Sequence, residues 1–98
     1  MRRYKIIVQP EAHAEVIEIF DDLQMVKDGL GERFLDELDN CFALLRQYPY
    51  GFQIRWKHYR YGYIKRFDYR VVYVVDGDAV YIYQVRHTAR KVSPEFGP

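Results

Sequence analysis

The hydrophobic positions of this chain follow two different periods, one in each half. In residues 10–26, and again in about 32–48, apolar residues recur at three- and four-residue spacing, which predicts two amphipathic helices. Pro10 suits the first turn of a helix, whereas Gly29-Leu30-Gly31 and Pro49 are typical of helix ends. The link between the two helices is short, so the pattern predicts a helical hairpin.

Outside the helices, short runs rich in β-branched and aromatic residues predict strands. Strand 69–76 is apolar on both faces, so we expect it to be central, with the helices on one side and a partly apolar cover on the other. Asp76-Gly77-Asp78 fits a tight hairpin turn. The expected strands are residues 4–9, 52–57, 60–67, 69–76 and 79–86, and residues 93–98 are expected to form a loosely held tail. The order predicts one α+β domain over residues 1–98, β-α-α followed by three or four strands, with the hairpin packed on a mainly antiparallel twisted sheet.

The length of 98 residues allows one core and leaves no room for a separate cofactor or substrate domain. Cys41 is the single cysteine and lies among apolar residues, so we expect a buried thiol, no disulfide and no clustered cysteine zinc site. No segment is apolar enough for a signal peptide or a membrane span. We therefore expect a cytoplasmic protein that needs no membrane, metal or cofactor.

The net charge of +1 hides a division along the chain. Residues 11–40 hold ten acids and two bases, whereas residues 41–98 hold ten bases and four acids. The acids also fit the solvent faces of amphipathic helices. The bases alternate with strand-forming aromatic residues, and a fixed array of cations suits a polyanion such as RNA or an acidic protein segment.

The order of elements, together with a set of short motifs, resembles the RelE/ParE superfamily of toxins from bacterial type II toxin-antitoxin pairs, often called plasmid stabilisation proteins. The resemblance runs nearly from end to end. Its motifs are Pro10-Glu11-Ala12, Gly29 through Leu35, Leu45 through Pro49, Arg60, Phe67 through Tyr73, and Val85-x-His87-x-x-Arg90. It implies a growth-inhibiting toxin that forms a hetero-oligomer with a cognate antitoxin.

The ribonuclease branch of this superfamily cuts messenger RNA on the ribosome by attack of a ribose 2′-hydroxyl on the adjacent phosphate, without a metal. For that branch the resemblance implies Arg70, Lys65 and His87 as catalytic residues. Arg70 matches the arginine of a Tyr-Arg-x-Val-Tyr motif, where a guanidinium would bind the scissile phosphate, and His87 could transfer a proton. We expect Arg60, Arg66 and Arg90 to bind the substrate. The RNA-cleaving reading is our first hypothesis, although a tyrosine that some of these nucleases place near the C-terminus is missing after Tyr83.

Each of these residues also has a structural interpretation. Arg70 could form an ion pair with Asp68 or Glu95. Lys65 and Arg66 would point to opposite faces of a regular strand, so at most one would enter a site. His87 and Arg90 could simply end the last strand.

The alternative hypothesis is a ParE-like toxin that poisons DNA gyrase by docking rather than by catalysis. Val85-x-His87-x-x-Arg90 and the missing C-terminal tyrosine favour it. A third hypothesis is a nucleic-acid-binding module without toxicity, which would bind RNA or DNA in a salt-dependent way.

Overall fold

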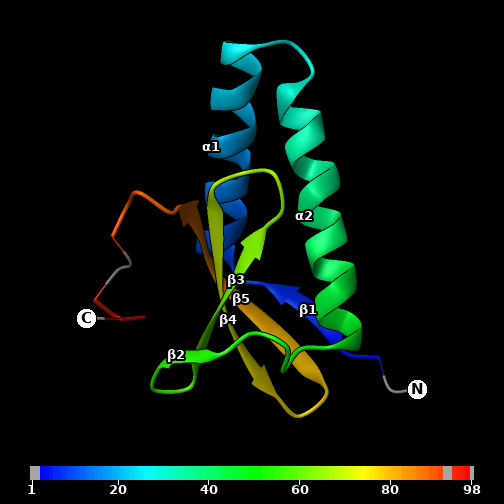
Figure 1. Ribbon diagram of the computed structural model, residues 1–98, viewed down its shortest axis with the longest axis vertical. Helices are drawn as coiled ribbons and strands as arrows, with labels where there is room; N and C mark the ends of the chain where they lie inside the picture. Colours follow the sequence, from blue (N-terminus) through cyan, green and yellow to red (C-terminus); the bar gives the residue numbers. More distant parts are fainter. Residues whose placement is uncertain (1–2, 92–93, 98) are drawn as a thin grey trace.

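Two helices and five strands follow one another in the computed structural model, which describes residues 3–91 and 94–97 (Figure 1). They are β1 (Lys5–Val8), α1 (Pro10–Val26), α2 (Leu30–Gln47), β2 (Ile54–Trp56), β3 (Tyr59–Ile64), β4 (Tyr69–Asp76) and β5 (Ala79–His87). The α+β order, the helical hairpin and the central position of residues 69–76 are those expected from the sequence.

The strands form one sheet in the order β1-β5-β4-β3-β2. β1 runs parallel to β5, and the other neighbours are antiparallel. β4 and β5 are joined by the predicted tight turn, in which Gly77 has a φ of 62°. β1 is short and its pairing with β5 reaches only from Lys5–Ala79 to Val8–Ile82. Along the edge that faces β1, the second half of β5 therefore lies beside helix α1 and not beside another strand.

The two helices form a hairpin over one face of the sheet (Figure 1). The hairpin closes tightly at Gly31, where an added Cβ would lie 2.7 Å from Cδ2 of Phe20 and 2.9 Å from Cγ of Gln24. The amide of Gly31 donates a hydrogen bond of 2.8 Å to Oε1 of Gln24. A glycine at this position therefore lets the start of α2 approach α1 closely.

The main core lies between the hairpin and the sheet. Its centre includes Phe34 and Leu45 from α2 and Val71 and Tyr73 from β4, all without exposed surface. The hydroxyl of Tyr73 donates a hydrogen bond of 2.7 Å to the carbonyl of Pro49, which satisfies this polar atom inside the core. Cys41 is also buried, as expected.

The strand limits differ from the sequence prediction between β3 and β4. β3 ends at Ile64, because residues 65–68 form a turn in which Arg66 takes a left-handed φ of 70°. The expectation that Lys65 and Arg66 alternate within a strand is wrong. The turn directs Phe67 toward the core, where its ring centroid lies 5.7 Å from that of Phe34.

The second face of the sheet is covered by the C-terminal tail. Phe96, which belongs to the tail, is 4% exposed. Val72, on the face of β4 that the tail covers, has no exposed surface. The expectation of a loosely held tail is therefore wrong at Phe96, while Ser93 and Pro98 lie outside the described residues. None of the helices in the described part of the chain has the length and apolar character needed to cross a membrane.

Candidate functional site

Arg70 lies on the sheet face opposite the helices and is 8% exposed. Its Nη2 atom donates a hydrogen bond of 2.8 Å to the carbonyl of Arg90, and its guanidinium carbon lies 5.5 Å from the ring centroid of Tyr61. It makes no ion pair with Asp68 or Glu95, both of which the structure describes. The expectation that Arg70 forms such an ion pair is therefore wrong. The main-chain carbonyl of Arg90 binds the guanidinium instead.

The tail is attached to the same face by an aromatic cluster. The ring centroid of Phe96 lies 5.1 Å from that of Tyr59 and 5.7 Å from that of Tyr83. The hydroxyl of Tyr61 donates a hydrogen bond of 2.8 Å to the carbonyl of Phe96. Arg70 is consequently shielded from solvent by the chain itself.

Arg60 lies on the helix side of β3 and holds the segment before β2. Its Nη1 atom donates a hydrogen bond of 2.6 Å to the carbonyl of Phe52, and its guanidinium lies 5.0 Å from the ring centroid of Tyr50. Both contacts are within the chain. Arg60 therefore stabilises the fold, and it lies on a different surface from Arg70.

Lys65 and Arg66 occupy the turn between β3 and β4, and both side chains are exposed. They line a hollow of about 520 Å³ whose other wall is α2, with Glu37 and Asn40 on that side. The sheet therefore presents these two cations at its end, away from the guanidinium of Arg70.

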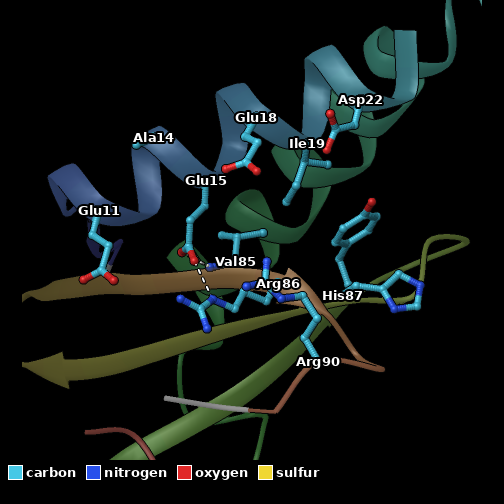
Figure 2. A pocket seen from close by; sticks show the side chains of 11 residues that line it. Glu11, Ala14, Glu15, Glu18, Ile19, Asp22, Val85, Arg86, His87 and Arg90 are labelled. Carbon is cyan, nitrogen blue, oxygen red and sulfur yellow. Dashed lines mark hydrogen bonds and ion pairs between the residues drawn. The ribbon is translucent and has the colours of Figure 1, made fainter. Parts of the chain in front are cut away.

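His87 lines a different hollow, of about 380 Å³, between α1 and the end of β5 (Figure 2). Its Nδ1 atom accepts a hydrogen bond of 3.0 Å from the amide of Ala89, and its ring packs edge-on against Tyr69 at 5.4 Å. Arg90 borders the same hollow. Four acids of α1 form the opposite wall: Glu11, Glu15, Glu18 and Asp22.

Arg70 and His87 lie on opposite faces of the sheet. Tyr69 is the cross-strand partner of His87, and Arg70 is the partner of Arg86. Directly paired residues share a face, whereas successive residues of a strand alternate. Arg70 is therefore separated from the other two expected catalytic residues, Lys65 and His87.

Four of the expected site residues do gather at one end of the sheet. The amide of Thr88 donates a hydrogen bond of 2.8 Å to the carbonyl of Asp68, which joins the end of β5 to the β3–β4 turn. Lys65, Arg66, His87 and Arg90 flank this junction and all have exposed side chains. We call these four residues the basic end of the sheet.

Glu15 lines the same hollow as His87 and makes contacts that the sequence did not predict. Its Oε2 atom pairs with Nε of Arg86 at 2.6 Å, and its Oε1 atom accepts a hydrogen bond of 3.1 Å from the amide of Val85 (Figure 2). That amide lies beyond the reach of β1, on the open edge of β5. The signal was a first strand too short to cover the last one, which leaves edge groups for helix α1 to satisfy.

The clear pKa shifts in this structure concern tyrosine and cysteine side chains, and all of them favour the protonated form. Burial raises the pKa of Tyr61, with the Arg70 cation acting in the opposite direction. Burial and, to a smaller extent, the Asp22 carboxylate raise the pKa of Tyr69. Both phenols are protonated at neutral pH, so neither is a ready general base. Across residues 3–91 and 94–97, no three His, Cys, Asp or Glu side chains come together in a way that could hold a metal ion.

Comparison with known proteins places this architecture in a family. A family model described as the ParE toxin of the type II toxin-antitoxin system, parDE, matches residues 6–92. The chain belongs to the ParE toxin family. The fold is also similar to a chain of the chromosomal ParDE toxin-antitoxin system from P. aeruginosa, with a TM-score of 0.75 and 13% sequence identity over 87% of this chain and 96% of that chain. None of the curated proteins matches.

Membership of the ParE toxin family confirms the resemblance read from the sequence motifs. It makes the chain a toxin component, and a toxin of this kind of system is paired with an antitoxin. The matched segment begins within β1, at residue 6, and contains the rest of the fold through β5 together with the basic end of the sheet. Phe96, which covers the second face, lies beyond it.

Proposed function

We propose that this chain inhibits growth by docking to DNA gyrase without itself catalysing a reaction, and that its antitoxin prevents this docking. The observation that carries the proposal is the separation of Arg70 from His87 and Lys65. A phosphate bound at the shielded Arg70 would have neither an acid nor a base at hand. Membership of the ParE toxin family supports the same reading.

RNA cleavage by 2′-hydroxyl attack makes stronger geometric demands. A general base, a general acid and a fixed cation must surround one phosphate, within hydrogen-bond reach of the reacting oxygens. Here the cation is covered by the tail, the imidazole lies on the other face, and the phenols of Tyr61 and Tyr69 remain protonated. Docking to a protein does not require an acid, a base and a cation around one reacting group.

The basic end of the sheet is the surface that we assign to gyrase. Its four side chains are exposed and come from the β3–β4 turn, the last residue of β5 and the turn that follows. A backbone hydrogen bond joins these segments, so the backbone positions that carry the side chains are fixed relative to one another. An array of this kind favours an acidic protein surface and speeds encounter with it. By contrast, Arg60 and Arg70 are engaged within the chain.

The proposal is tested by measuring the supercoiling activity of purified gyrase with the toxin, and by mapping 5′ ends of cellular RNA within minutes of induction. We expect loss of supercoiling, accumulation of cleaved DNA complexes and intact messages. The double variant Lys65→Glu/Arg66→Glu should weaken inhibition at least tenfold. Lys5→Glu is the control, since Lys5 is exposed at the opposite end of the sheet.

New cuts in translated messages with unaffected gyrase would replace this proposal with the RNA-cleaving one. Inhibition of gyrase that is equally sensitive to Lys5→Glu and to the double variant would retain the target and reject the assigned surface.

A further inference from the structure

Arg70 is a buried cation whose guanidinium is only partly satisfied. Among residues 3–91 and 94–97 it makes one side-chain hydrogen bond, to the neutral carbonyl of Arg90, and its Nε atom finds no hydrogen-bond partner there. No carboxylate among the described residues pairs with it. A buried cation without a counter-ion is unfavourable, because the lost hydration is not replaced. The guanidinium is therefore suited to receive an anion from outside the described chain.

An aromatic cluster lies on the same face as this cation, and Phe96 packs among its rings. The Phe96 ring packs edge-on against Tyr59, while its carbonyl accepts the hydroxyl of Tyr61. Tyr83 closes the other side. We call Tyr59, Tyr61, Arg70 and Tyr83 the tail site.

The polar contacts that hold the tail are few. Its described residues, 88–91 and 94–97, form turns without helix or strand pairing. Its two bonds from β3 and β4 side chains both end on neutral main-chain carbonyls. A carboxylate would bind the guanidinium about twice as strongly as a neutral acceptor and could engage Nε as well. Phe96 therefore packs well against the aromatic rings of the tail site, whereas a main-chain carbonyl is a weak partner for the Arg70 cation.

We propose that the tail site is a docking surface for an extended segment of a partner protein that carries a carboxylate next to an aromatic side chain, and that Phe96 occupies it in the free chain. The aromatic side chain takes the place of Phe96, and the carboxylate gives Arg70 a counter-ion that the described residues do not supply. Phe96 lies outside residues 6–92, the segment that the family model matches.

The structure favours a peptide over a nucleic acid at this surface. The occupant already present is a peptide, held through main-chain carbonyls and one aromatic ring. The site contains one cation, whereas binding to nucleic acid relies on several phosphate contacts. The proposal concerns a different surface from the basic end of the sheet, so its failure would leave the gyrase proposal standing.

The test uses the full chain and a synthetic eight-residue acidic peptide with a single phenylalanine. Trp56 is the only tryptophan and its ring stacks on Tyr59 at 6.3 Å, so its fluorescence reports on replacement of Phe96. We expect saturable binding that is lost when the peptide's phenylalanine is changed to serine. Replacing its acids by amides should weaken binding at least tenfold.

Substitutions in the chain separate competition from simple surface binding. Phe96→Ala should tighten peptide binding about tenfold, because it removes an internal ligand that keeps most molecules closed. Tyr61→Phe keeps the ring and removes only the bond to the tail, so it should tighten binding to a smaller extent. In the Phe96→Ala background, Arg70→Gln should abolish the preference for acids over amides, and Lys65→Gln should leave it unchanged.

Unchanged affinity in both Phe96→Ala and Tyr61→Phe, with far-ultraviolet circular dichroism showing a folded chain, would overturn the proposal. So would an acid preference that survives Arg70→Gln. Tighter binding of a single-stranded RNA of equal charge would reassign the surface to nucleic acid.

Discussion

Glu15 and Arg86 form an ion pair that attaches the middle of α1 to the open edge of β5, with 2.6 Å between Oε2 and Nε. The side chains are 14% and 21% exposed, so solvent screens the pair little. The second carboxylate oxygen of Glu15 accepts the amide of Val85. One side chain thus satisfies a main-chain donor and a cation at the place where β1 stops.

Replacing Glu15 should destabilise the fold. Glu15→Ala leaves the Arg86 guanidinium and the Val85 amide without their shared acceptor, and we expect a loss of about 2–4 kcal/mol in the free energy of unfolding. Urea denaturation measures this loss. Glu18→Ala is the control, since Glu18 is exposed on the same helix, and should change stability by less than about 0.5 kcal/mol. Equal effects of the two substitutions would contradict the bridging role of Glu15.

Gly31→Ala should separate the two helices. A Cβ there would meet the main-chain oxygen of Phe20 at 2.8 Å, which the backbone cannot avoid without moving. We expect a net loss of about 1–3 kcal/mol, although alanine is the better helix former by about 1 kcal/mol. Thermal unfolding should show the difference. Gly77→Ala provides a comparison for backbone strain alone, since its φ is 62° and no atom of the described residues lies within 4 Å of the added Cβ.

Tyr73 should make the fold sensitive to alkaline pH. Burial raises the pKa of Tyr73 to about 12, against 10.0 for the free side chain. The folded chain therefore retains this proton between pH 10 and 12 while the unfolded chain releases it, so stability is full below pH 10 and falls as pH rises toward 12. The slope approaches about 1.4 kcal/mol per pH unit. Tyr73→Phe should reduce this alkaline loss, and urea titrations across that range can compare the two chains.

Cys41 should react slowly with thiol reagents. Burial raises the pKa of the Cys41 thiol to about 11, so little thiolate exists at pH 8, and the sulfur is shielded as well. We expect modification by a disulfide reagent to be at least a hundredfold slower in the folded chain than in urea. Rapid modification at pH 8 without denaturant would show that the helices open readily around Cys41.

Arg70→Ala should release the tail as well as remove a cation. The bond to the carbonyl of Arg90 is lost, and we expect faster tryptic cleavage after Arg90 and Lys91 together with a loss of about 1–2 kcal/mol in stability. Lys65→Ala should change neither quantity. Loss of toxicity in Arg70→Ala therefore counts as evidence for RNA cleavage only when the tail remains protected.

The sequence by itself determined the order of elements and the layer arrangement. Helical spacing in the first half and alternation in the second are local patterns, and glycine and proline act on the backbone where they stand. The apolar character of both faces of residues 69–76 was sufficient to place β4 at the centre. Motifs spread over the whole chain were sufficient to identify the family.

Only the tertiary structure decided which side chains meet. Arg70 and His87 belong to adjacent paired positions, yet the alternation of strand side chains sends them to opposite faces. The turn at Arg66 removes Lys65 from the strand, and β1 is too short to cover β5, which brings Glu15 to Arg86. Phe96 returns to the sheet from a segment without periodicity. Such contacts depend on register, strand length and the path of the tail, which arise from packing across the whole molecule, so local patterns in the sequence do not specify which side chains meet.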